Sequence, residues 1–198
     1  MHIEVKKLTP ELADDYARFF DTTPHNNDNH GDKCYCVTFC RDNVYNNGGE
    51  HWYPTASERR THGIRRVKDS DIQGYLAYSG GEVIGWCNAN AKSDCQKIIE
   101  NMRARAGFPV EDECGGEKTK CVFCFAIAPK MQRAGVAAQL LEFICRDAAA
   151  DGFDFVEAMT HREFTQDGFR GVLELYEKCG FVVHAECEGR VVVRKLLK

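Results

Sequence analysis

The sequence contains no apolar stretch long enough to cross a lipid bilayer, which takes about 20 consecutive apolar residues. Residues 1–10 are polar and charged and lack the apolar centre of a secretion signal. Basic residues are not in excess, since 26 Lys and Arg are outnumbered by 30 Asp and Glu and the net charge is −4. These absences argue against a membrane or nucleic-acid partner and make the cytoplasm the expected location.

Cysteine, in contrast, is abundant, with 11 residues in the chain. The count is odd, and Cys121, Cys124 and Cys145 lie inside apolar runs, which favours reduced, buried thiols over a disulfide framework. On a regular strand, Cys121 and Cys124 would point to opposite faces, so no local disulfide or chelate is expected between them.

The order of apolar segments and turn residues predicts a mixture of strands and helices. The predicted strands are 3–7, 74–79, 83–89, 121–128, 153–159, 181–186 and 190–196, with a hairpin turn at Gly80 and Gly81. The predicted helices start at Pro10 after the N-cap Thr9, and cover 57–68, 95–106, 135–150 and 169–179. Loops around an extended piece, 35–39, are expected over 21–54, and the charges of 58–66 are expected on a solvated helix face. This order indicates an α/β or α+β sheet with helices on its faces.

The most informative segment joins an apolar run to a helix that begins with glycine. The run 121–128 shows no alternation, which is typical of a strand buried on both faces. After Gly135, apolar residues recur with helical spacing at Val136, Leu140, Ile144 and Ala148. A helix start presents unpaired N–H groups and partial positive charge, and glycine lets an anion approach the backbone. The segment therefore predicts a phosphate-binding turn.

The residues of this turn resemble a known family signature. The segment 132–137, Gln-Arg-Ala-Gly-Val-Ala, is similar to the Q/R-x-x-G-x-G/A motif of the GNAT superfamily of N-acetyltransferases. The preceding strand, the following helix and the later segment 175–181 have the family's order, so the resemblance covers about 74–197. It implies a mixed, mostly antiparallel, twisted sheet of about seven strands flanked by helices. It also implies that the central strands 121–128 and 153–159 splay apart.

The resemblance further implies a single domain over 1–198 that uses acetyl-CoA as co-substrate. Residues 1–73 would form the substrate side and residues 74–198 the acetyl-CoA-binding core. The backbone N–H near Ile127 would polarise the thioester carbonyl. The residues implied in cofactor binding are Phe125, Ala126, Ile127, Gln132, Arg133, Ala134, Gly135, Val136, Ala137 and Ala138.

Three side chains are candidates for the chemistry that the resemblance implies. Tyr176 is matched to the tyrosine that often protonates the departing CoA thiolate in this family. Glu157 and His161, at or after the splayed strand, are candidate bases for the incoming amine, directly or through water. The chain departs from the family pattern at Phe169 and Val172, where many members have Asn and Ala.

The implied function is transfer of an acetyl group to a primary amine, on a small molecule or a peptide, by direct attack in a ternary complex. The missing Asn leaves open a non-catalytic module that binds or senses acyl-CoA. A zinc-dependent regulatory protein is a third hypothesis, because Cys34, Cys36 and Cys40 have histidines nearby, namely His25, His30 and His51. Their spacing matches no usual zinc pattern, so no metal is expected. The acceptor amine, a redox role for these cysteines and a homodimer are left open.

Overall fold

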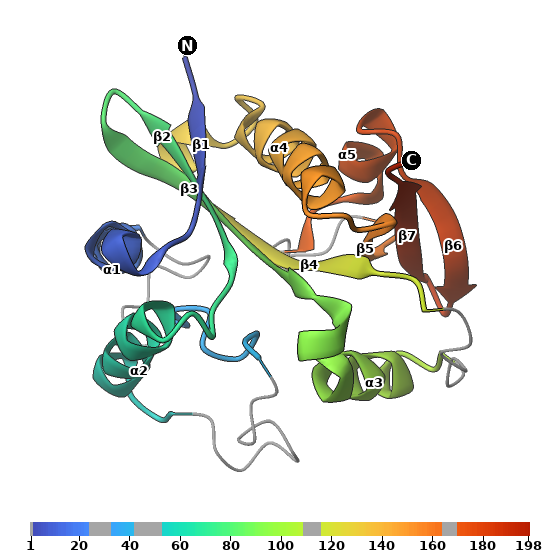
Figure 1. Cartoon of the computed structure of the whole chain (residues 1–198), viewed down its shortest axis with the longest axis horizontal. Helices are drawn as coiled ribbons and strands as arrows, with labels where there is room; N and C mark the ends of the chain where they lie inside the picture. The colour runs from blue at the N-terminus through green and yellow to red at the C-terminus, as the bar shows by residue number, and fades with distance from the viewer. Residues whose placement is uncertain (1, 24–32, 42–52, 109–115, 164–169) are drawn as a thin grey trace.

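The computed structural model describes residues 2–23, 33–41, 53–108, 116–163 and 170–198. Seven strands form one sheet in the order β1-β2-β3-β4-β5-β7-β6 (Figure 1). They are β1 (Glu4–Lys7), β2 (Gly74–Ser79), β3 (Glu82–Ala91), β4 (Thr119–Ile127), β5 (Phe155–His161), β6 (Val182–Cys187) and β7 (Arg190–Leu196). Only the β4–β5 pair is parallel, and the other neighbouring strands are antiparallel. This confirms the predicted mixed, mostly antiparallel sheet.

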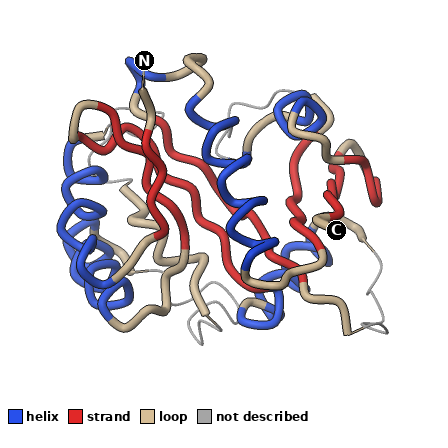
Figure 2. The backbone as a smooth tube through the Cα atoms, turned by 45° about the horizontal axis from the view of Figure 1, so that its top comes forward, coloured by secondary structure: helices blue, strands red, loops and turns tan. Residues whose placement is uncertain are grey.

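Helices cover both faces of the sheet. They are α1 (Ala13–Thr22), α2 (Ala56–Lys68), α3 (Gln96–Arg105), α4 (Val136–Ala150) and α5 (Leu173–Lys178), with short 3-10 turns at Pro10–Leu12, Lys92–Asp94 and Pro129–Met131. In Figures 1 and 2, α4 and α5 lie on one face, and α1, α2 and α3 lie on the other.

Close packing of α4 on β3 depends on one glycine. The apolar stripe of α4, including Val136 and Leu140, is buried in the main core. A Cβ at Gly85 on β3 would lie 2.9 Å from a Val136 methyl and 3.0 Å from the Ile127 side chain. Glycine at this position therefore lets the start of α4 sit directly over the strands.

On the opposite face, α2 is fixed by its cap and by a buried arginine. The Thr55 hydroxyl accepts a hydrogen bond from the Glu58 N–H at 3.2 Å, and the Glu58 carboxylate accepts one from the Thr55 N–H at 3.0 Å. Arg59 is 1% exposed and donates to the carbonyls of Lys33 and Tyr53, each at 2.6 Å. The expectation of a solvated basic face is therefore wrong for Arg59, because backbone carbonyls replace water around its guanidinium. It is also wrong for Arg66, which is 7% exposed.

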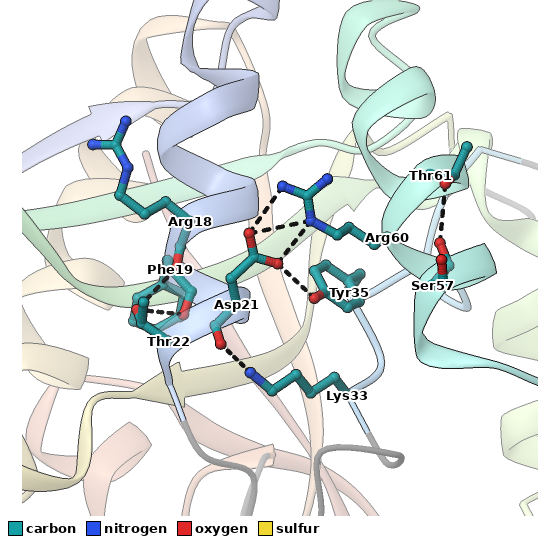
Figure 3. Close-up of polar contacts among 9 residues, drawn as sticks. All are labelled: Arg18, Phe19, Asp21, Thr22, Lys33, Tyr35, Ser57, Arg60 and Thr61. Atoms are coloured by element: carbon teal, nitrogen blue, oxygen red, sulfur yellow. Dashed lines mark hydrogen bonds and ion pairs between the residues drawn. The ribbon is translucent and has the colours of Figure 1, made fainter.

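An ionic cluster joins α1, α2 and the segment 33–41, which we call the N-terminal loop (Figure 3). The Asp21 carboxylate accepts hydrogen bonds from the Arg60 guanidinium at 2.8 and 2.9 Å and from the Tyr35 hydroxyl at 2.7 Å. The Lys33 ammonium donates to the Asp21 carbonyl. These contacts hold the N-terminal loop against the sheet face opposite α4.

The N-terminal loop is turned where 35–39 was predicted to be extended. Tyr35 and Cys36 have φ values of 45° and 47°, in the left-handed region. Two contacts require this path, since the Tyr16 hydroxyl donates to the Tyr35 carbonyl and the Cys36 Sγ lies 3.0 Å from the Cys124 Sγ. An extended segment would not bring both groups inward together.

Two predicted helices start later than expected. A 3-10 turn precedes α1, and the Thr9 side chain makes no capping hydrogen bond. The helix predicted over 169–179 begins at Leu173, because Gly171 has φ 75° and Val172 is extended. Phe169 lies outside the described residues.

A bulge in β4 changes which face its cysteines occupy. Asn88 pairs with Cys124 while Ala89 pairs with Val122, so Phe123 is the extra residue. Cys121 packs with the apolar side of α3, and Cys124 packs in the cluster under α1, on the same side of the sheet. The expectation of opposite faces is wrong, because the extra residue breaks the alternation.

Candidate active site

The parallel strands β4 and β5 separate immediately beside this bulge. Their paired residues run from Thr119 with Phe155 to Val122 with Ala158, while β4 continues to Ile127 and β5 to His161. We call the space between these diverging ends the strand opening. The predicted splaying of the two central strands is therefore present.

The backbone of β4 presents N–H groups to the strand opening. The Ala128 N–H donates to the Ile84 carbonyl on the β3 side at 3.0 Å. Because N–H groups of successive strand residues point to alternate sides in the sheet plane, those of Phe125 and Ile127 point away from β3. The Gln132 side chain donates to the Ile127 carbonyl at 3.5 Å, consistent with this direction.

The turn before α4 has the geometry expected of an anion site. Arg133 and Gly135 have φ values of 62° and 82°, and the first helical hydrogen bond runs from the Gln139 N–H to the Gly135 carbonyl at 3.1 Å. The N–H groups of residues 136–138 precede that bond and lie at the positive end of the helix dipole. A Cβ at Gly135 would meet no atom within 4 Å, so the backbone is open to a ligand.

A cleft of about 340 Å³ lies between this turn and α5. It is lined by Ile127, Met131, Gln132, Arg133, Gly135, Val136, Ala137, Ala138, Val172, Glu174, Leu175 and Lys178. Seven of these belong to the ten residues predicted to bind cofactor. Of the other three, Ala134 is exposed on the turn, Phe125 is buried in the main core, and Ala126 packs on the opposite face.

The α5 side of the cleft was not predicted from the sequence. Val172, Glu174, Leu175 and Lys178 line it, and a salt bridge of 2.7 Å joins Glu174 to Lys178. The sequence did point to this region, since segment 175–181 matches the order of segments in the GNAT superfamily. Which of its side chains reach the cleft depends on how α5 packs beside α4.

Tyr176 lies behind the cleft, within the core. It is 0% exposed, its ring centroid is 6.4 Å from that of Phe125 and 5.3 Å from that of Phe181, and its hydroxyl donates to the Arg170 carbonyl at 2.7 Å. Burial, with a smaller contribution from the nearby Cys87 thiol, raises the pKa of Tyr176 well above its usual value. The hydroxyl therefore keeps its proton at neutral pH.

Glu157 is held in a buried ion pair. Its Oε2 accepts hydrogen bonds from the Arg194 guanidinium at 2.6 and 3.0 Å, and its Oε1 lies 3.9 Å from the Lys92 ammonium. Glu157 is 4% exposed and pairs with Cys121, before the strands separate. Burial and the contact with Arg194 restrict its access to a substrate.

His161 is the last residue of β5, at the strand opening, and is partly buried. Side chains alternate along β5, and Val156 and Ala158 face α4 within the main core. His161 therefore points to the other face, the one covered by α3 and the N-terminal loop. The structure brings Tyr176 to one side of the sheet and both candidate bases to the other.

In the N-terminal loop, Cys36 and Cys40 are buried thiols, whereas Cys34 is partly exposed. Burial raises the pKa of Cys36 well above its usual value, and it raises that of Cys40 to about 11 although the Arg66 guanidinium lies 2.7 Å from its sulfur. Within the described ranges, no group of three or more potential ligands is arranged to hold a metal ion. The three histidines of the zinc hypothesis, His25, His30 and His51, lie outside those ranges. None of the described helices has the length and apolarity that a membrane crossing requires.

Comparison of the fold with solved structures gives several matches over nearly whole chains. An acetyltransferase of the GNAT family from Streptococcus pneumoniae is 16% identical, with 100% of both chains covered and a TM-score of 0.52. The PaiA N-acetyltransferase from Thermoplasma acidophilum, solved in complex with coenzyme A, is 14% identical over 99% of both chains, with a TM-score of 0.54. The GNAT domain of S. lividans PAT is 18% identical over 98% of this chain and 90% of that one, with a TM-score of 0.55. These likenesses concern the fold.

Sequence comparison supplies the family. A search of curated proteins finds no match. The family model described as "Acetyltransferase (GNAT) family" matches residues 41–181, which include the strand opening, the turn before α4 and all of α5. Since this match spans well over half of the 198 residues, the chain belongs to the acetyltransferase (GNAT) family, whose members use acetyl-CoA.

Proposed function

We propose that this protein is an N-acetyltransferase that moves the acetyl group of acetyl-CoA to a primary amine by direct attack in a ternary complex. The observation that carries the proposal is the strand opening, which lies directly beside the cleft at the start of α4. A phosphate-bearing ligand with a long arm would bind its phosphates at the turn and reach between the strands.

In this proposal, the pyrophosphate of acetyl-CoA accepts hydrogen bonds from the N–H groups of residues 136–138. The Arg133 and Lys178 side chains, which line the cleft, add positive charge near the phosphates. The pantetheine arm enters the strand opening and brings the thioester carbonyl to the N–H of Ile127. That donor would stabilise the negative charge that develops on the carbonyl oxygen.

The acceptor amine attacks the thioester carbon, so a C–N bond forms and the C–S bond breaks. The departing thiolate takes a proton from the Tyr176 hydroxyl, which burial keeps protonated. No covalent enzyme intermediate is required, and the proton on the nitrogen is lost to a base on the acceptor side.

We assign that base role to His161 rather than Glu157. His161 lies at the end of β5 on the face opposite Tyr176, and imidazole accepts protons near neutral pH. Glu157 is 4% exposed and lies where β4 and β5 still pair, before the strand opening.

The acceptor would enter from the face that residues 1–73 help to cover, with 74–198 as the acetyl-CoA-binding core of a single domain. The N-terminal loop reaches this face, because the ring of Phe39 stacks on that of Phe123 at 5.2 Å, next to the strand opening. We place the reaction in the cytoplasm, where such thiols stay reduced.

The test is a panel of amines incubated with acetyl-CoA and the purified protein. The panel contains polyamines, amino acids, aromatic amines and peptides with a free N-terminus or lysine, each with its hydroxyl analogue as control. Products are detected by mass, which identifies the acetylated amine directly. We expect an acetylated amine and no acetylated hydroxyl analogue. Tight acetyl-CoA binding without any product would contradict the proposal and favour a non-catalytic acyl-CoA-binding module.

A further inference from the structure

The segment Arg170, Gly171 and Val172, which we call the 170–172 strap, is tied to the end of β5. Thr160 on β5 is 0% exposed, and its hydroxyl donates to the Gly171 carbonyl at 2.7 Å. The next residue, His161, forms a parallel β-bridge with Val172. A buried hydroxyl that donates to a carbonyl is a stabilising connection, because breaking the bond would leave a buried polar group without its partner.

The strap also contacts the other side of the strand opening. Gly171 has φ 75°, and a Cβ on it would lie 3.3 Å from the side chains of Leu175 and Tyr176 and 3.5 Å from the Phe125 ring of β4. The strap therefore packs between β5, β4 and α5, where the opening begins. A change in its position would move the groups that surround the opening.

The strap holds the hydroxyl of the proposed acid. The Tyr176 hydroxyl donates to the carbonyl of Arg170, the residue directly before Gly171, at 2.7 Å. Thr160 and Tyr176 are thus joined through two consecutive peptide units. The Thr160 hydroxyl fixes one carbonyl, and the neighbouring carbonyl orients the phenol.

We propose that Thr160 is a positioning residue for acetyl transfer, acting through the 170–172 strap on the Tyr176 hydroxyl. This inference rests on the proposed function, in which Tyr176 protonates the thiolate. Thr160 touches neither substrate nor reacting atoms. It sets where the acid lies relative to the strand opening.

The kinetic test uses Thr160→Val, which removes the hydroxyl and keeps the shape of the side chain. Proton transfer depends steeply on placement, so we expect kcat to fall about tenfold while the Kd of acetyl-CoA changes less than about twofold. Thr160→Ser keeps the hydroxyl and should restore kcat. Thr119→Val changes a buried threonine at the start of β4 and should leave kcat unchanged.

A double-mutant cycle with Tyr176→Phe identifies the route of the effect. If Thr160 acts through the tyrosine, Thr160→Val should have little effect on kcat in the Tyr176→Phe background. An equal fold-loss of kcat in both backgrounds would overturn the proposal. It would leave acetyl transfer itself intact, since the wild type would still acetylate the amine.

A second readout needs no acceptor and no activity. In protein labelled with ¹³C at the tyrosine Cζ, the Tyr176 resonance is identified by its absence in Tyr176→Phe. We expect Thr160→Val to shift this resonance and Thr160→Ser to leave it near its wild-type position. An unshifted Tyr176 resonance in Thr160→Val would overturn the positioning role, whether or not the wild type proves to be an acetyltransferase.

Discussion

Replacing Gly135 by Asp or by Asn separates charge from shape at the turn before α4. Gly135 has φ 82° and ψ 4°, a left-handed conformation that Asn and Asp tolerate better than other non-glycine residues. A Cβ there meets no atom within 4 Å, so neither variant introduces a clash at this atom. The two side chains have nearly the same size and shape, which leaves the negative charge as the main difference between the two variants.

The size of the effect follows from the distance between charges. An aspartate at this turn would lie beside the proposed pyrophosphate, and two unit charges 4 Å apart repel by about 1 kcal/mol in water and about 4 kcal/mol at an effective dielectric of 20. The turn is exposed, so the water-like value applies to each of roughly two phosphate charges. The expected difference of about 2 kcal/mol corresponds to a Kd about thirtyfold weaker for Gly135→Asp than for Gly135→Asn.

The assay is calorimetric titration of acetyl-CoA into the wild type and both variants, with unfolding curves to verify that the two variants are equally stable. At high salt, the Kd values of Gly135→Asp and Gly135→Asn for acetyl-CoA should become more similar, because exposed charges are screened. Equal affinities of the two variants at low salt would refute a phosphate at this turn.

Three further predictions concern other parts of the molecule. Tyr176→Phe should lower kcat about 100-fold, which is the loss expected when a general acid is removed. The affinity for acetyl-CoA should change little; steady-state kinetics and calorimetry measure the two quantities. An unchanged kcat would mean that another group protonates the thiolate. Glu157→Gln leaves Arg194 short of its buried partner, so the free energy of unfolding in denaturant should fall by about 3 kcal/mol with kcat within about twofold of wild type. A large kcat loss at unchanged stability would instead make Glu157 the base. Hydrogen bonds from Arg60 hold the pKa of Asp21 below its usual range, so Asp21 stabilises the fold above about pH 4 and loses this contribution as the pH falls through its folded pKa. The difference in free energy of unfolding between the wild type and Asp21→Asn, measured in denaturant, should therefore become smaller below about pH 4. A difference that does not change with pH would contradict the ion pair.

The strand, turn and helix around Gly135 could be predicted because their signals are local. An unbroken apolar run, a glycine and an apolar stripe of helical period each act over a few residues, and the structure has β4, the turn and α4 in that order. The hairpin between β2 and β3 could be predicted for the same reason, because its turn is encoded by the adjacent residues Gly80 and Gly81.

The remaining features depend on contacts between distant parts of the chain. The N-terminal loop takes left-handed turns because Tyr35 and Cys36 contact residues of α1 and β4, and no pattern within 35–39 encodes those partners. The bulge at Phe123 depends on the register of β4 against β3. The ion pair of Glu157 depends on the register of β5 against β7, where Arg194 lies directly opposite.

The most direct test of the proposed site is a crystal structure of the protein with bound coenzyme A. We predict phosphate oxygens within hydrogen-bond distance of the N–H groups of residues 136–138, and the pantetheine arm in the strand opening with its sulfur beside the Tyr176 hydroxyl. Phosphates bound away from the turn, or a sulfur remote from Tyr176, would contradict the site and the role of its acid.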